Sequence, residues 1–133
     1  MANYFSGNMK VRMGGNNLYV WMTKKGEAVS TPKGIDIIKK VEKNFADITC
    51  YTIETLFRTY KIECMPGAKV VTDKGVKKIE SLKPGDGVYV FGAFTPKRLT
   101  MVKKIKKEKL DYDNVYNLSL SGEYYIEGMI FNA

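Results

Sequence analysis

Short runs of alternating apolar and polar residues, separated by glycine, asparagine, aspartate and proline, dominate the chain. This pattern is typical of many short β-strands joined by tight turns. Two hairpins stand out, with strands predicted at 9–13 and 18–23, and at 70–72 and 76–79. Further strands are predicted within 48–63 and at 88–91, 98–107, 115–120, 124–126 and 129–131. Residues 32–47 fit either a short amphipathic helix or a strand followed by a turn, because their apolar residues follow no single period.

A weak internal repeat runs through this pattern. Four segments of the first half, 23–26, 38–41, 47–53 and 60–63, resemble 72–75, 102–105, 114–120 and 124–127 in the same order. The spacings lie near half of the 133 residues, which predicts two halves related by a pseudo-twofold axis. The alternative is two unrelated meanders with similar strand composition.

The composition indicates one globular domain over residues 1–133, with 1–17 as a candidate N-terminal extension. The chain is 44% hydrophobic and 27% charged, and no run approaches the roughly 18 apolar residues of a membrane helix. The first residues show no signal-peptide pattern. Cys50 and Cys64 form no Cys-x-x-Cys pair, so we expect reduced thiols, no metal, no cofactor and a cytoplasmic protein.

The chain contains no histidine. This excludes Ser-His-Asp and Cys-His catalysis and histidine-ligated zinc. A general base would have to be a carboxylate, a lysine, a tyrosine or a thiolate.

Three segments carry a family resemblance. They read CMPGAKVVTDKG at 64–75, VKKIESLKPGDGV at 76–88, and VYNLSL followed by YYIEGMIFNA within 115–133. Together they resemble the Hint domain shared by inteins and hedgehog autoprocessing proteins. The resemblance implies an all-β horseshoe of two halves related by pseudo-twofold symmetry, with at most one short helix.

Two alignments to this family remain open. In the first, Cys64 is the opening nucleophile, and residues 1–63 are an unrelated extension. In the second, which the repeat favours, the whole chain is one Hint-like domain, and 62–88 is its central motif.

The resemblance also indicates that the chemistry has been lost. In the whole-chain alignment no nucleophile stands near Met1, Gly67 replaces the histidine of the Thr-x-x-His motif, and Phe131 replaces the penultimate histidine. Asn132 is kept, but Ala133 has no nucleophile to accept an acyl group. The chain is therefore predicted not to be an enzyme, with Cys64, Gly67, Phe131 and Asn132 as degenerate positions.

Individual residues still allow two interpretations. Cys64 is either a thiolate activated by Lys61 or Lys69, or a small apolar residue at a strand end. Asp86 follows Pro84 and Gly85 and is predicted to cap its turn.

Lysines form the last candidate signal, with a net charge of +8 for the chain. The candidate partner-binding residues are Lys103, Lys104, Lys106, Lys107 and Lys109. Such a cluster can neutralise phosphates, but acidic residues follow closely, and lysines on exposed strands also prevent edge pairing.

These observations predict an inactive Hint-like structural or protein-interaction module, for instance a phage virion or tail component. The alternatives are residual self-processing through Cys64 and Asn132, and a basic nucleic-acid-binding β-barrel. The expected partners are other subunits of an assembly, or an acidic protein or nucleic acid, and not a membrane. Exposed strand edges are compatible with a homo-oligomer, and a cytoplasmic or virion location is expected.

Overall fold

The computed structural model describes residues 2–133, which contain strands and 3-10 turns but no α-helix. The strands are β1 (Phe5–Ser6), β2 (Lys10–Met13), β3 (Asn16–Tyr19), β4 (Ala28–Thr31), β5 (Gly34–Ile37), β6 (Lys40–Thr55), β7 (Thr59–Cys64), β8 (Lys69–Thr72), β9 (Gly75–Lys78), β10 (Gly87–Val90), β11 (Arg98–Ser119), β12 (Glu123–Ile126) and β13 (Met129–Asn132). Two 3-10 turns, η1 (Val20–Met22) and η2 (Ile79–Ser81), follow β3 and β9. No helix of the described residues is long and apolar enough to span a membrane.

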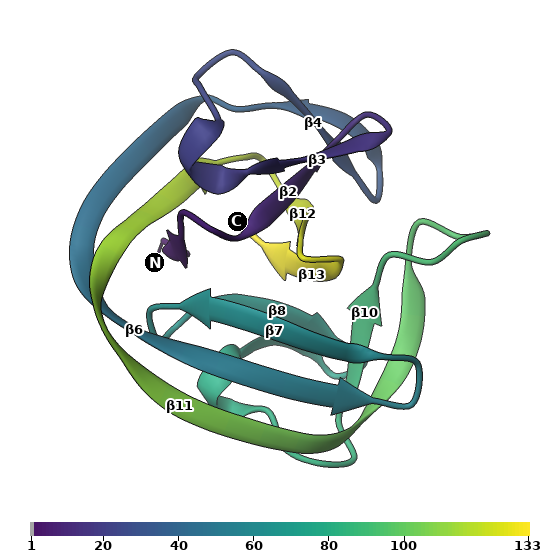
Figure 1. The fold of residues 1–133 in the computed structure, drawn as a ribbon. Coiled ribbons are helices and arrows are strands. Elements are labelled where there is room, and N and C mark those ends of the chain that lie inside the picture. The colour runs from purple at the N-terminus through teal and green to yellow at the C-terminus, as the bar shows by residue number, and fades with distance from the viewer. Residues whose placement is uncertain (1) are drawn as a thin grey trace.

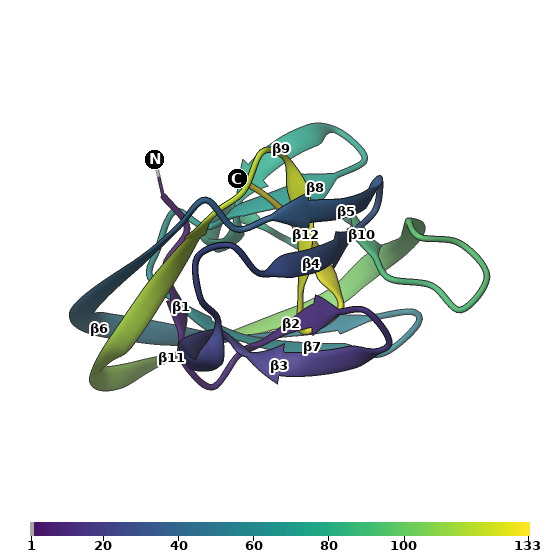
Figure 2. The same cartoon turned by 90° about the horizontal axis from the view of Figure 1, so that it is seen from above.

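Eleven strands form one continuous sheet in the order β1-β7-β6-β11-β10-β8-β13-β12-β2-β3, with β9 paired to β8. The remaining strands, β4 and β5, pair only with each other. The long strands β6 and β11 pair antiparallel and curve around the fold, and in the view of Figure 1 both ends of the described chain lie within their arc. Seen from above, the molecule is flattened (Figure 2). The predicted all-β horseshoe is confirmed.

The two halves repeat each other more closely than the sequence suggested. β2, β3 and η1 correspond to β8, β9 and η2 at a constant spacing of 59 residues. The hydrogen bonds correspond as well, since Val20 N donates to Met9 O at 2.8 Å and Ile79 N donates to Ala68 O at 2.8 Å. Val20 and Ile79 are both fully buried, so each half seats its 3-10 turn with one apolar side chain.

The predicted repeat segments are partly correct. Ile38 and Val102 do correspond, because each donates its backbone N–H to equivalent turn residues, Glu27 O at 2.9 Å and Asp86 O at 2.8 Å. The match between 23–26 and 72–75 is wrong. Thr72 begins the β8–β9 turn, whereas Thr23 follows η1. The residue of the second half that corresponds to Thr23 is therefore Leu82, which follows η2.

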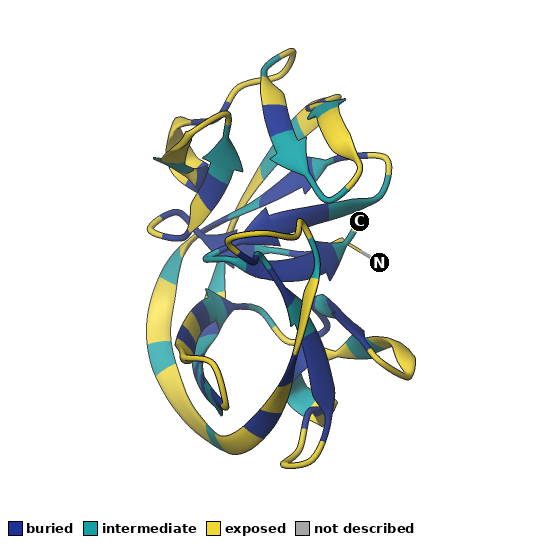
Figure 3. Ribbon diagram, turned by 90° about the vertical axis from the view of Figure 1, so that its right-hand side faces the viewer, coloured by how far each residue is buried: buried dark blue, intermediate teal, exposed yellow. Residues whose placement is uncertain are grey.

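The long strands also differ from the prediction. We expected separate strands at 98–107 and 115–120, but β11 runs without a break from Arg98 to Ser119. None of the residues 103–114 is buried, and only Ile105 among them packs partly against the core, so that stretch has too few core-facing residues to impose an alternating pattern (Figure 3). Residues 32–47 form β5 and the start of β6, which excludes the short helix there.

The core lies where the strands of the two halves cross. Its fully buried residues include Phe5, Val11, Val70, Ile126 and Phe131, drawn from five different strands. Figure 3 shows these central strands buried, and the outer arc largely exposed along the middle of β11. Because β1 and β13 supply part of this core, the two ends of the described chain are fixed by packing.

Candidate functional site

Asn3 connects the beginning of the chain to its end. Its Nδ2 donates to the hydroxyl of Tyr124 at 2.9 Å and to the backbone oxygen of Asn132 at 2.8 Å. Its Oδ1 accepts from the backbone N–H of Lys69 at 3.0 Å. Asn3 is 1% exposed. A buried amide with its donors and acceptor all satisfied holds its neighbours in a single arrangement. We call Asn3, Lys69, Tyr124 and Asn132 the terminus site.

Aromatic rings enclose the terminus site. The ring of Phe5 packs edge-on against Phe131, with centroids 4.9 Å apart, and against Tyr124 at 6.4 Å. All three side chains are fully buried. Burial also raises the pKa of the Tyr124 hydroxyl. Phe131 therefore contributes packing at the position where the resemblance places a histidine, and it has no group that can transfer a proton.

Cys64 ends β7 beside this site. It pairs with Phe5 across the sheet, and its side chain is fully buried. Burial raises the pKa of the Cys64 thiol, and the negative charge of Glu80 raises it further. The thiolate is the nucleophilic form of cysteine, so a protonated and enclosed Cys64 is inert at neutral pH. The structure therefore favours the apolar interpretation of Cys64.

The turn after Cys64 is held by backbone contacts. Met65 N donates to Tyr4 O at 2.9 Å, which attaches the turn to the beginning of the chain. Gly67 has a φ of 98°, and its N–H donates to Glu80 Oε1 at 2.8 Å. Gly67 is thus a turn residue here, with no side chain to replace the missing histidine.

The peptide group of Asn132 is hydrogen-bonded on both sides. Its oxygen accepts from Asn3, and Ala133 N donates to Gly122 O at 3.1 Å. Attack of the Asn132 side chain on its own carbonyl would need a base for the amide and an acid for the leaving amine. The Tyr124 hydroxyl, which shares the amide of Asn3 with the Asn132 oxygen, does not match these tasks, because burial raises its pKa and keeps it protonated. The arrangement polarises the carbonyl without supplying a base.

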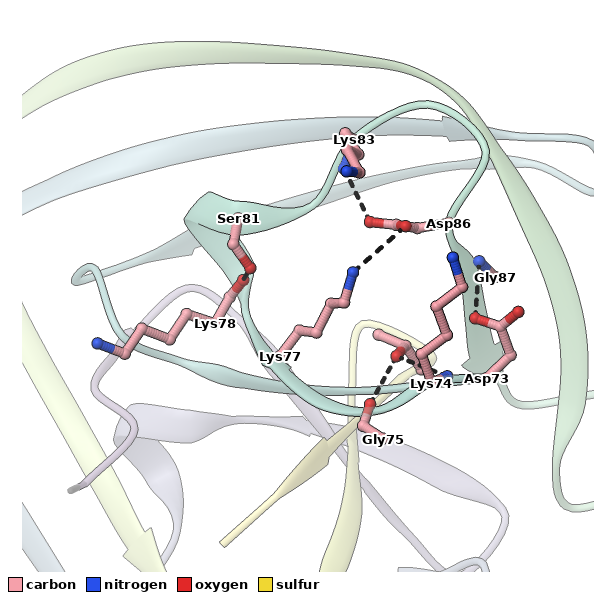
Figure 4. Close-up of polar contacts among 10 residues, drawn as sticks. Asp73, Lys74, Gly75, Lys77, Lys78, Ser81, Lys83, Asp86 and Gly87 are labelled. Carbon is pink, nitrogen blue, oxygen red and sulfur yellow. Dashed lines mark hydrogen bonds and ion pairs between the residues drawn. The ribbon is translucent and has the colours of Figure 1, made fainter.

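Asp86 caps its turn, as predicted. Its Oδ2 accepts from Lys83 N at 3.1 Å, and Lys77 Nζ lies 3.4 Å from Oδ1 (Figure 4). Asp86 is 2% exposed. Burial opposes its ionisation, but the Lys83 hydrogen bond and the Lys77 charge lower the pKa of Asp86 overall. This conspicuous motif residue is therefore structural.

The predicted partner-binding lysines all lie on β11 and do not form one surface. Lys103 Nζ is 3.9 Å from Glu54, and Lys107 Nζ donates to Glu80 O at 2.7 Å and lies over the ring of Tyr51. Lys104, Lys106 and Lys109 are exposed. Since successive strand residues point to opposite faces, this cluster is divided between the two sides of the β6–β11 ribbon.

Neither a protein-family profile nor a curated protein sequence matches the chain. Solved structures do. The gp41-1 intein is similar with a TM-score of 0.80 and 19% identity, and 100% of both chains is covered. A DnaB intein from Synechocystis sp. PCC 6803 has a TM-score of 0.81 and 12% identity over 99% of both chains. The chain has the Hint fold.

A third Hint-fold relative is a bacterial intein-like domain from Clostridium thermocellum. It has a TM-score of 0.79 and 15% identity, covering 100% of this chain and 99% of that chain. The predicted family resemblance is thereby confirmed at the level of the Hint fold. Identities this low establish the fold alone, so activity has to be argued from the residues present.

Sequence reasoning missed the residue that organises the terminus site. Asn3 is an isolated polar residue ahead of the first strand, and its partners lie 66 to 129 residues away. No local motif signals such contacts. The only available sign was the placement of the Hint motifs, which brings the start of the chain next to Asn132.

Proposed function

We propose that this chain is a Hint-fold domain that does not splice and that serves as a protein-interaction module. The observation that carries the first part is the state of Cys64, which is fully buried with a raised thiol pKa in a chain without histidine. Self-processing of the intein type needs an exposed nucleophile and groups that move protons. Ala133 after Asn132 also leaves no acceptor for a second acyl transfer.

An exposed apolar surface supports the interaction role. A groove of about 350 Å³ lies between the β6–β7 turn and the start of β11. Leu56 is 70% exposed, Leu99 51% and Met101 49%, and all three line the groove. Contiguous apolar side chains on a surface mark protein-interaction sites. Assembly with other protein subunits therefore stays our preferred partner class, ahead of nucleic acid.

The test of the first part is an intact-mass time course. The domain is produced between two unrelated flanking segments and kept for days at neutral pH, with and without a small thiol that would intercept a thioester. We expect the full mass to persist in both samples. Cleavage that depends on the added thiol, and that disappears in Cys64→Ala, would overturn the proposal.

Residual cleavage after Asn132 is the second candidate. The contact that favours it is the 2.8 Å hydrogen bond from Asn3 Nδ2 to the Asn132 oxygen, which would stabilise negative charge on that oxygen during cyclisation. In the same time course this activity would release only the C-terminal flanking segment. Release should stop in Asn132→Ala. It should continue in the control variant Asn114→Ala, which changes an exposed asparagine on β11.

A further inference from the structure

A second polar cleft lies away from the terminus site. It encloses about 250 Å³ between β2, the start of β7, the residue after β10 and the β12–β13 turn. Three basic side chains, Lys10, Arg12 and Arg58, line it together with a single carboxylate, Glu127, which leaves a net charge of +2 at neutral pH. None of the ion pairs within residues 2–133 uses any of these three cations.

Aromatic rings hold the two guanidinium groups of the cleft. Arg12 lies 3.8 Å from the ring centroid of Phe91, and Arg58 lies 4.7 Å from that of Tyr60. Stacking on a ring fixes the plane of a guanidinium but leaves its N–H donors unpaired. The cleft therefore presents two oriented hydrogen-bonding forks that no carboxylate of the described chain occupies.

Glu127 sits in this cleft at a conformational cost. With a φ of 52° it adopts the left-handed region beside Gly128, whose φ is 86°. Two-residue hairpin turns of this kind prefer Asn-Gly. Here the Glu127 carboxylate accepts from Lys10 N at 2.6 Å, and Glu127 N donates to Lys10 O at 2.9 Å. The carboxylate is thereby engaged by the backbone and forms no ion pair with the guanidinium groups.

We propose that this cleft binds a phosphate group, either free or carried by a small phosphate monoester. A phosphate monoester has a charge near −2 at pH 7, equal and opposite to the charge of the cleft. Its three oxygens match the paired donors of Arg12 and Arg58. Asn17, which also lines the cleft, adds an uncharged side-chain amide as a further donor.

The test is a calorimetric titration of the full chain with inorganic phosphate and with glycerol 3-phosphate at about 100 mM salt, where distant charges are largely screened. We expect saturable binding that weakens about 10-fold or more in Arg12→Gln and in Arg58→Gln. The matched control is Lys74→Gln, which removes an equal charge from an exposed site in the β8–β9 turn and should leave Kd unchanged. Tighter binding of the ester assigns the site to monoesters, and equal binding assigns it to phosphate alone.

A variant with the opposite expected sign separates binding from damage to the fold. Glu127→Gln keeps an oxygen for Lys10 N and removes the negative charge, so inorganic phosphate should bind more tightly, by about 3-fold or more. A variant that merely disturbed the fold would weaken binding. Absence of saturable binding, an equal loss in Lys74→Gln, or weaker binding in Glu127→Gln would each overturn the proposal.

Discussion

The terminus site and the cleft around Glu127 are built on equivalent backbone positions of the two halves. Lys69 and Lys10 each begin a strand, β8 and β2, and lie 59 residues apart. Each donates its backbone N–H to a side chain from a remote part of the chain, Asn3 Oδ1 at 3.0 Å and Glu127 Oε2 at 2.6 Å. The pseudo-twofold symmetry therefore provides the same backbone donor twice.

The side chains make the two sites different. At the terminus site the acceptor is a neutral amide that also donates to Tyr124 and Asn132, and the whole group is buried under aromatic rings. At the cleft the acceptor is a carboxylate, and burial raises the pKa of Glu127 against the opposing effect of Lys10 and Arg58. The comparison shows that the same backbone arrangement accommodates two different chemical environments. The terminus site is buried with its hydrogen bonds satisfied, and the Glu127 cleft is open and charged.

The largest effect is expected for thiol alkylation, which tests how completely the terminus site is closed to solvent. Cys64 is fully buried there, so it should react only when the protein opens. We expect its rate in buffer to be at least about 1,000-fold below its rate in denaturant, because a domain of ordinary stability opens only rarely. Peptide mass spectrometry after timed quenching measures this rate, with the partly exposed Cys50 as the internal control. Equal rates for the two cysteines would show that the site is open.

Removing the acceptor side chain of each site, Asn3 or Glu127, compares how much each site contributes to the free energy of unfolding. Asn3→Ala removes the three hydrogen bonds to Lys69 N–H, the Tyr124 hydroxyl and the Asn132 oxygen, and should lower the free energy of unfolding by about 2–4 kcal/mol. Glu127→Ala removes one hydrogen bond beside an open cleft and should cost about 1 kcal/mol. Urea denaturation measures both values. If Asn3→Ala cost no more than Glu127→Ala, the terminus site would not be the more tightly organised of the two.

The smallest expected effect concerns the backbone at Glu127. Glu127→Gly and Glu127→Ala both remove the carboxylate, so their difference reports only the left-handed conformation. We expect the glycine variant to be more stable by about 1 kcal/mol. The same pair at Glu63, a residue of the regular strand β7, is the control, and there glycine should be the less stable variant. A glycine variant no more stable than alanine at position 127 would mean that the turn carries no conformational cost.

The sequence predicted the parts of this molecule that depend on local chemistry. The hairpin turns, the capping role of Asp86 and the all-β class follow from glycine, aspartate and alternation, and the Hint resemblance supplied the arrangement. The length of β11 was not predictable, because the exposure of residues 103–114 removes the pattern that would reveal it. The role of Asn3 and the proposed phosphate cleft could not be predicted from the sequence either, because their residues meet only after separate strands have paired. The missing histidines were readable at once, whereas the enclosure of Cys64 required the structure.

The pairing of β6 with β11 has a consequence for how the chain folds. It joins residues 40–55 to residues 102–119, so no part of that ribbon can form until segments far apart in sequence have met. Loop closure of this kind must precede the stabilising contacts, and chains dominated by such contacts reach the native state in milliseconds to seconds. In a chain cut between β7 and β8, β6 keeps only its hairpin with β7, and β11 keeps only its short pairing with β10, so each fragment lacks the main partner of its long strand. Such fragments should acquire the native structure only when both are mixed. The same ribbon that leaves the lysines exposed therefore makes folding one slow, all-or-none event.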